Sequence, residues 1–174
     1  MEQANIPSPL RQYLHLNFKG AYMYTYYTDG AASRNGAEDA EGGWAYICVN
    51  DEKVLYGLDG YIAHATNNIC ELMAVNRALN DAILNGHDGA IIYTDSAYIA
   101  NCFKDKWYIK WMNNGWITSK NTPVKNKELW ESIISKIESG NYQIEKIKGH
   151  NGNIYNDMVD AMAVKARVNG ASSS

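Results

Sequence analysis

Two stretches of the sequence end in the same tripeptide, Tyr-Thr-Asp, and each places a carboxylate directly after a run of β-forming residues. The first carboxylate is Asp29, followed by Gly30, and the second is Asp95, followed by Ser96. Taken singly, an Asp in this position is more often a turn residue or a helix N-cap. If the two strands are neighbours in one sheet, both carboxylates lie at the edge where open α/β sheets build their sites. The repeated tripeptide therefore favours a paired carboxylate site.

Two further carboxylates lie on predicted helices. Glu71 comes three residues after Asn68, so it is either the glutamate of a capping box or a third carboxylate aimed at the strand ends. Asp160 precedes an apolar stripe that we expect to face the sheet. An acidic residue near a helix N-terminus is favourable on its own, but an unpaired carboxylate on the core side is costly, so Asp160 is a candidate for the same site. The stripe comprises Ala161, Val164 and Val168.

Carboxylates that converge without compensation repel one another, and their pKa values rise. Hard divalent cations with oxygen ligands reverse that effect, so the cluster predicts two Mg²⁺ ions, for which Mn²⁺ can substitute. Such a site activates a water molecule, holds the non-bridging oxygens of a phosphodiester and stabilises the leaving oxygen in an in-line displacement. The carboxylates thus predict metal-dependent phosphodiester hydrolysis.

The framework that must hold these carboxylates is visible as regular patterns between residues 21 and 168. Three β-branched or aromatic runs, at residues 21–28, 43–49 and 54–61, predict an antiparallel meander. Residues 68–84 change to helical period and precede a short buried strand at 90–94. The other predicted elements are helices at 96–103, 125–139 and 154–168 and a strand at 142–148. This order predicts an α/β fold with a five-stranded mixed sheet, an antiparallel meander plus two parallel strands, and helices on both faces.

Length and composition limit the class of protein. The chain has 174 residues, 46% of them apolar and 20% charged, which suits one globular domain. It has no apolar run of about eighteen residues and no signal-peptide pattern at its start, so we expect no membrane association. Its three cysteines are far apart, which argues against a disulfide framework and favours a cytoplasmic location. We expect an N-terminal arm at 1–20, a catalytic domain at 21–169 and a disordered tail at 170–174.

Charge is distributed unevenly along the chain. Residues 104–127 contain six Lys and one Asp, a local charge of +5, so with a total of −3 the remainder sums to −8. A basic segment on an acidic body predicts a polyanion-binding surface beside a site that takes cations. Trp107 and Trp111 have the spacing of a helical packing pair. We therefore expect the tryptophans to support this segment while its lysines contact phosphates.

Four separated motifs, taken together, resemble those of type 1 ribonuclease H in order and spacing. The motifs are Thr28-Asp29-Gly30, Thr66-Asn67-Asn68-x-x-Glu71-Leu72-Met73-Ala74, Thr94-Asp95-Ser96, and Lys148-Gly149-His150-Asn151-Gly152-x-x-x-Asn156-Asp157-x-x-Asp160. The resemblance covers roughly residues 21–168. It implies a ribonuclease H-like fold, two-metal cleavage of the RNA strand of RNA–DNA hybrids, and products with 5′-phosphate and 3′-hydroxyl ends.

The resemblance also implies roles for individual residues. Asp29, Glu71, Asp95 and Asp160 correspond to the family's four catalytic, metal-binding carboxylates, and His150 to a loop histidine that assists water activation or product release. Glycines close to His150 on both sides suit a loop that moves a titratable group to and from a site. The substrate-binding residues implied by the family or by the basic segment are Asn35, Asn67, Asn68, Lys104, Lys106, Trp107, Lys110, Trp111, Lys125 and Asn126.

The sequence departs from the family pattern at two positions. Ala97 stands where many bacterial members have Gln, and Asn153 replaces a common second His of the loop. We expect a monomeric enzyme that acts on RNA–DNA hybrids. Two alternatives are a hybrid-binding module without catalysis, which has no need of four carboxylates, and a resolvase- or transposase-like nuclease. The Glu71 motif and the Trp-rich basic segment argue against the latter.

Overall fold

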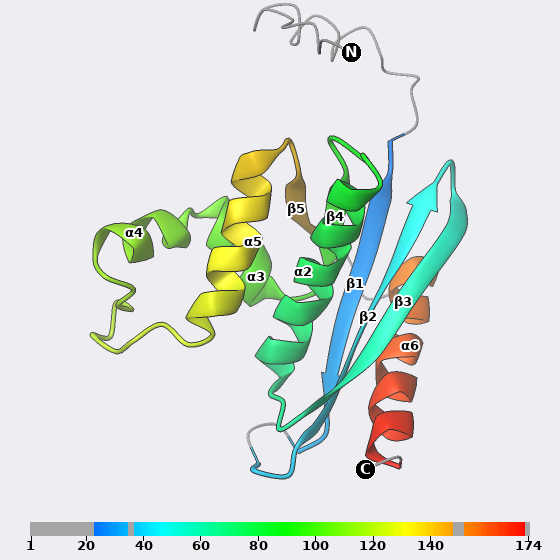
Figure 1. Ribbon diagram of the computed structural model, residues 1–174, viewed down its shortest axis with the longest axis horizontal. Helices are drawn as coiled ribbons and strands as arrows, with labels where there is room; N and C mark the ends of the chain where they lie inside the picture. The colour runs from blue at the N-terminus through cyan, green and yellow to red at the C-terminus, as the bar shows by residue number, and fades with distance from the viewer. Residues whose placement is uncertain (1–22, 35–36, 148–151, 173–174) are drawn as a thin grey trace, which may run out of the picture.

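The computed structural model describes residues 23–34, 37–147 and 152–172, which form one mixed sheet with helices on both faces (Figure 1). The strands are β1 (Thr25–Ala32), β2 (Glu41–Asn50), β3 (Lys53–Ala63), β4 (Ile91–Thr94) and β5 (Gln143–Lys146). The helices are α2 (Asn67–Leu84), α3 (Ala97–Lys104), α4 (Trp107–Asn113), α5 (Lys127–Ser139) and α6 (Ile154–Ala171). Within these residues the sheet has five strands in the order β3-β2-β1-β4-β5. The predicted α/β class and sheet composition are confirmed.

The central strand, β1, joins the two halves of the sheet. It pairs antiparallel with β2, which pairs antiparallel with β3, and it pairs parallel with β4, which pairs parallel with β5. Helix α2 packs on β1, β2 and β4, and α6 packs on the other face against β1, β2 and β3 (Figure 1). None of the helices in the described part of the chain is long and apolar enough to cross a membrane.

β1 is longer at its end than the sequence pattern predicts. Asp29 lies inside the strand, opposite Ala45 of β2, and pairing continues to Ala32 opposite Gly42. The predicted end at Thr28 is wrong because β2 supplies a ten-residue partner. Parallel pairing with β4 does stop at Thr28. Beyond that residue, no strand among the described residues pairs with this side of β1, and the site described below lies there.

The packing face of α6 also differs from the predicted one. The buried residues are Val159, Ala163 and Ala166, whereas Val168 of the predicted stripe is 51% exposed. The reason is close approach: a Cβ on Gly43 of β2 would lie 2.0 Å from the carbonyl oxygen of Ala163. The small residues Ala163 and Ala166 therefore face the sheet, and the predicted stripe that ends in Val168 does not form the packing face of α6. The helix also continues to Ala171, so the first two residues of the expected tail belong to it.

The tryptophans of the basic segment belong to the hydrophobic core. Trp111 of α4 is 7% exposed, and its ring meets the fully buried ring of Trp130 of α5 edge-on, with centroids 5.4 Å apart. Trp107 packs beside Tyr98 of α3. This arrangement supports the expectation that the tryptophans hold the segment against the domain.

Candidate active site

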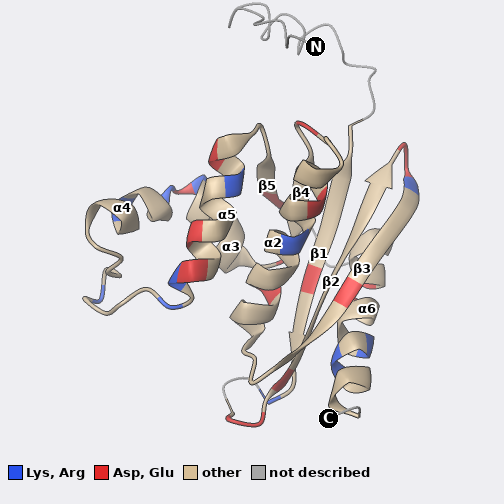
Figure 2. Ribbon diagram, viewed as in Figure 1, with Lys and Arg blue, Asp and Glu red and all other residues tan. Residues whose placement is uncertain are grey.

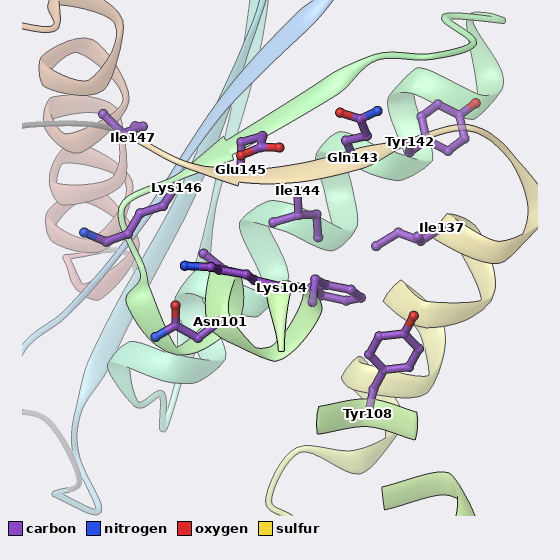
Figure 3. Close-up of a pocket in the computed structure, with 12 residues that line it drawn as sticks. Asn101, Lys104, Tyr108, Ile137, Tyr142, Gln143, Ile144, Glu145, Lys146 and Ile147 are labelled. Carbon is purple, nitrogen blue, oxygen red and sulfur yellow. The ribbon is translucent and has the colours of Figure 1, made fainter. Parts of the chain in front are cut away.

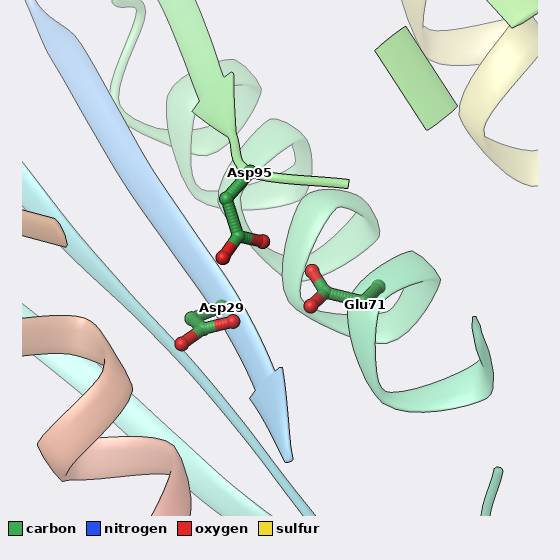
Figure 4. A group of neighbouring side chains, drawn as sticks. All are labelled: Asp29, Glu71 and Asp95. Atoms are coloured by element: carbon green, nitrogen blue, oxygen red, sulfur yellow. The ribbon is translucent and has the colours of Figure 1, made fainter. Parts of the chain in front are cut away.

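Three carboxylates converge where β1, β4 and α2 meet. Asp29 lies in β1, Asp95 directly follows β4, and Glu71 comes from the second turn of α2. One oxygen of each carboxylate lies within 4.8 Å of the corresponding oxygens of the other two. Figure 4 shows the three side chains pointing toward one another from three separate elements. The predicted adjacency of the two Tyr-Thr-Asp strands is confirmed by the β1–β4 pairing.

Two fully buried threonines hold the strand ends that carry the aspartates. The hydroxyl of Thr28 donates to the carbonyl oxygen of Tyr93 at 2.9 Å and so ties β1 to β4. The hydroxyl oxygen of Thr94 accepts from the backbone N–H of Ser96 at 3.1 Å. Each bond lies next to an aspartate, so the threonines restrict the backbone that presents the carboxylates.

Gly30 brings α2 close to β1. A Cβ at this position would lie 2.4 Å from the backbone carbon of Cys70 and the backbone nitrogen of Glu71, so only glycine permits the approach. Its N–H also donates to Oδ1 of Asp29 at 2.8 Å. This role is not among those predicted from the sequence, although a glycine within a strand is a known signal for close backbone approach.

The start of α2 decides between the two interpretations of Glu71. Thr66 is the N-cap, and its hydroxyl oxygen accepts from the N–H of Ile69 at 3.2 Å. Glu71 is therefore too far along the helix for a capping box, in which the glutamate follows the cap by three residues. Asn67 accepts from the N–H of Ala32 at 3.0 Å and ties the helix to the end of β1. These contacts aim Glu71 at the aspartates.

Burial and crowding favour the protonated forms of Asp29 and Glu71. Burial, followed by the charge of Asp95, raises the pKa of Asp29 to about 7, and Asp160 adds a smaller contribution in the same direction. The pKa of Glu71 lies well above its ordinary value because the group is buried and faces both aspartates. Two or three ionised carboxylates are therefore energetically unfavourable in this site unless a positive charge compensates them.

The donor set fits hard divalent cations. The oxygens of Asp29, Glu71 and Asp95 are the ligands that Mg²⁺ and Mn²⁺ prefer. Oε2 of Glu71 is buried and has no hydrogen-bond partner among the described residues, so it is an acceptor available to a cation. A bound cation would also offset the repulsion that raises the pKa values.

The raised pKa of Asp29 predicts a pH effect on stability. The unfolded group titrates near 3.8 and the folded group at about 7, so between these values the folded state holds more protons and the free energy of unfolding falls as pH rises. We expect the difference in stability between the wild type and Asp29→Asn to change by up to about 4 kcal/mol across this window. Urea unfolding in chelator at about pH 4.5 and about pH 7.5 measures it. If the difference in the free energy of unfolding between the wild type and Asp29→Asn were the same at both pH values, the raised pKa of Asp29 would be contradicted.

Asp160 flanks the three carboxylates from α6. It is exposed, and the expectation that it faces the core is wrong because the small-residue face of α6 packs on β2. It lies outside the group in which oxygens are within 4.8 Å. Its charge nonetheless contributes to the raised pKa of Asp29, which places it near the cluster.

Two predicted site residues, His150 and Asn35, lie outside the described residues. The helix that follows His150 in the sequence, α6, has a capped N-terminus. The side-chain oxygen of Asn153 accepts from the N–H groups of Tyr155 at 3.0 Å and Asn156 at 3.2 Å. Asn153 therefore has a structural function at the position where the family often has a second His.

The predicted substrate residues divide into two surfaces. Asn67 and Asn68 are exposed at the start of α2, one turn from Glu71. The lysines are exposed at the end of α3, along α4 and in the loops on either side of α4 (Figure 2). Asn126 is half-buried in a left-handed conformation before α5. The exposed lysines are Lys104, Lys106, Lys110 and Lys125.

A hollow in the described part of the protein is separate from the carboxylates. It has a volume of about 620 Å³ and lies between β5 and the helices α3, α4 and α5 (Figure 3). Of the predicted site residues only Lys104 lines it, while apolar side chains such as Phe103 and Ile144 contribute much of its wall. The carboxylates lie instead at an open strand edge, which suits a large polymeric substrate better than a small enclosed one.

Comparison with known proteins agrees with this geometry. The sequence pattern of the RNase H family matches residues 22–168. The chain is 37% identical over 140 residues to the ribonuclease H of Clostridium botulinum, which is 80% of this chain and 92% of that protein. It is 39% identical over 140 residues to the ribonuclease H of Prosthecochloris aestuarii, with the same coverage.

Solved structures share the fold. The solution structure of the PFV RNase H domain superposes with a TM-score of 0.69 at 26% identity and covers 88% of this chain and 97% of that one. LC11-RNase H1, solved in complex with RNA/DNA hybrid, has a TM-score of 0.65 at 20% identity over 85% of this chain and 99% of its own. The predicted ribonuclease H-like fold is therefore confirmed. With a family match over most of its length and relatives above one-third identity, this chain belongs to the RNase H family and is an endoribonuclease of the hydrolase class.

Proposed function

We propose that this chain hydrolyses the RNA strand of RNA–DNA hybrids with two divalent cations, Mg²⁺ or Mn²⁺ as its substitute, and leaves 5′-phosphate and 3′-hydroxyl ends. The observation that carries the proposal is the convergence of Asp29, Glu71 and Asp95 within 4.8 Å. Relatives named ribonuclease H and the hybrid complex of LC11-RNase H1 support the substrate class.

The carboxylates have distinct tasks in this proposal. Asp29, Glu71 and Asp95 hold the cations, and Asp160 completes the set from α6. When bound, the cations supply a hydroxide-like nucleophile near neutral pH and stabilise the charge that develops on the phosphate. Asp29 and Glu71 must lose the protons that burial favours, while the N–H of Gly30 keeps Asp29 oriented. His150 assists proton transfer and remains a prediction from the sequence.

Selectivity for the hybrid must come from groups outside the carboxylates, because the phosphodiesters of RNA and DNA are alike. Asn67 and Asn68 lie at the start of the helix that carries Glu71, so their amides are well placed to contact 2′-hydroxyls and minor-groove edges near the cleaved bond. Asn35 is a third candidate. The lysines on and around α4 would bind phosphates of the other strand.

The experiment that tests the function compares three labelled duplexes of one sequence: hybrid, RNA and DNA, each with Mg²⁺, Mn²⁺ or chelator. We expect cleavage of hybrid with either metal, little cleavage of duplex RNA, none of duplex DNA, and no activity in chelator. Mapping the ends by mass spectrometry tests the product chemistry. Equal cleavage of duplex DNA and hybrid would favour the resolvase-like alternative. Binding of the hybrid without cleavage would favour the alternative of a hybrid-binding module without catalysis.

The basic segment makes a separate prediction about salt. Replacing Lys104, Lys106 and Lys110 together with Gln should weaken hybrid binding and reduce the magnitude of the log–log salt slope by up to about 0.9 for each phosphate that is no longer neutralised. The rate at saturating substrate should change little. Fluorescence anisotropy over a salt series measures the slope. Lys53→Gln, at the first residue of β3, is the control and should leave the slope unchanged. A slope unaltered in the triple variant would contradict phosphate binding.

A further inference from the structure

The hollow between β5 and the helices α3, α4 and α5 has two cations on its wall. Lys104, the last residue of α3, and Lys146, the last residue of β5, both line it and are both exposed (Figure 3). Neither ammonium group forms a salt bridge with a described residue. Two unpaired ammonium groups at one hollow favour an anionic ligand.

Lys146 lies on the face of β5 that the helices cover. Ile144 pairs in register with Ile92, a fully buried member of the core that includes residues of α2 and α5. Alternation along the strand places Ile144 and Lys146 on this same face and Glu145 on the other. Glu145 also borders the hollow, but its side chain leaves the strand on the opposite side. The charge that β5 presents toward α3 is therefore the ammonium group of Lys146.

Two aromatic rings form another part of the wall. Phe103 and Tyr108 are half-buried, line the hollow and pack together with ring centroids 5.4 Å apart. Phe103 also packs beside the fully buried Trp130, with centroids 6.0 Å apart, so the core holds the pair in place. Nucleobases of any sequence stack on aromatic side chains, and a groove that combines such rings with cations is typical of sites for single-stranded nucleic acid.

The hollow begins next to the candidate active site. Lys146 is in register with Thr94 of the neighbouring strand β4, and Thr94 directly precedes Asp95. From there the hollow follows β5 back to Tyr142, a length of about 17 Å at about 3.3 Å per residue. Lys104 belongs both to the hollow and to the basic segment. The hollow therefore continues the surface that we assign to the hybrid.

An extended acidic peptide that pairs with the outer edge of β5 is the alternative occupant. This edge is a poor template for another strand, because β5 has only four residues and two of them, Glu145 and Lys146, are charged. The shared position of Lys104 instead connects the hollow with a surface for phosphates. These observations favour a nucleic acid over a peptide.

We propose that this hollow binds a single-stranded extension of the DNA strand of the hybrid, with bases against Phe103 and Tyr108 and phosphates at Lys104 and Lys146. The inference rests on the proposed function, in which the lysines on and around α4 bind the strand that is not cleaved. The protein would thus prefer hybrids that adjoin single-stranded DNA over hybrids with blunt ends.

The test measures fluorescence anisotropy in chelator, so that the hybrid stays intact. A blunt hybrid is compared with the same hybrid carrying about six deoxythymidines at the 5′ or the 3′ end of its DNA strand, a length within the usual size of such sites. We expect the extension of one polarity to tighten binding to the wild type by about tenfold, the effect of roughly one stacked base.

Two variants locate the effect. Asn101→Trp places a large ring in the hollow without changing charge, and it should reduce the gain from the extension to less than about twofold. Lys146→Gln should reduce the log–log salt slope by up to about 0.9 for the extended hybrid only. Both variants should bind and cleave the blunt hybrid like the wild type. Lys53→Gln, at the far end of the sheet, is the control and should keep the full gain. Thermal unfolding checks that all variants are folded.

The outcomes separate this inference from the proposed function. Binding and cleavage of the blunt hybrid without a gain from either extension would overturn the inference alone, as would a gain that persists in Asn101→Trp. If the blunt hybrid were neither bound nor cleaved, the proposed function would fail and the inference with it. No gain, together with binding of a labelled peptide of alternating Asp and Phe that Asn101→Trp abolishes, would assign the hollow to an acidic peptide.

Discussion

Replacing Asp29 with Asn is expected to reduce hybrid cleavage by at least about 1,000-fold, which corresponds to about 4 kcal/mol of barrier, while the protein stays folded. The amide keeps the shape of the side chain but removes one of the three converging negative charges that would hold the cations. The folded state should even gain stability in chelator, because burial and crowding penalise the charged Asp29. Cleavage assays and calorimetry on the same sample measure the two effects.

The control for this variant is Asp51→Asn, which makes the same chemical change in the β2–β3 turn. Asp51 is exposed and has a φ of 49°, a conformation that Asn tolerates well. The Asp51→Asn variant should keep wild-type activity and stability. Added Mg²⁺ should raise the unfolding temperature of the wild type and of Asp51→Asn but not of Asp29→Asn. Near-normal turnover by Asp29→Asn would refute the assignment of the metal site.

Gly30→Ala is expected to damage both stability and activity. Its Cβ would lie 2.4 Å from backbone atoms of Cys70 and Glu71, so the start of α2 must move away from β1. We expect a loss of about 1–3 kcal/mol in the free energy of unfolding, as for an overpacked core. Because the shift separates Glu71 from Asp29, cleavage should also fall by about 100-fold, the cost of a misplacement near 1 Å. Urea unfolding and saturating kinetics measure the two losses.

Gly86→Asn serves as the matched control for the glycine. Gly86 has a φ of 67° and no atom within 4 Å of an added Cβ, so Asn meets no steric contact there and tolerates the left-handed backbone. This variant should change stability only slightly and leave activity intact. If Gly30→Ala behaved like Gly86→Asn, close approach of α2 would not be needed for the site.

Much of the fold and of the site was predictable from local patterns. Alternation and helical period identify all five strands and the helices α2, α3, α5 and α6 to within a few residues at most ends, because these periods reflect which face is buried. The repeated Tyr-Thr-Asp tripeptide predicts that Asp29 and Asp95 meet, since parallel strands of one sheet end at the same edge. The run of lysines and the helical spacing of Trp107 and Trp111 also predict a basic segment that tryptophans hold against the domain, and the contact of Trp111 with Trp130 agrees with this.

The remaining features depend on contacts between distant segments, which no local pattern contains. β1 continues past Asp29 because β2 is long enough to pair with it. Glu71 reaches the aspartates because Gly30 lets α2 approach and Thr66, not Asn68, caps the helix. Asp160 lies at the side of the cluster because α6 packs on β2 through Ala163 and Ala166. These small side chains and Gly43 allow a closer approach than the predicted stripe with Val164 and Val168 would. Local sequence thus specifies which carboxylates are available and which strands carry them, whereas their convergence depends on close packing of backbone on backbone, which is possible only where side chains are absent or small.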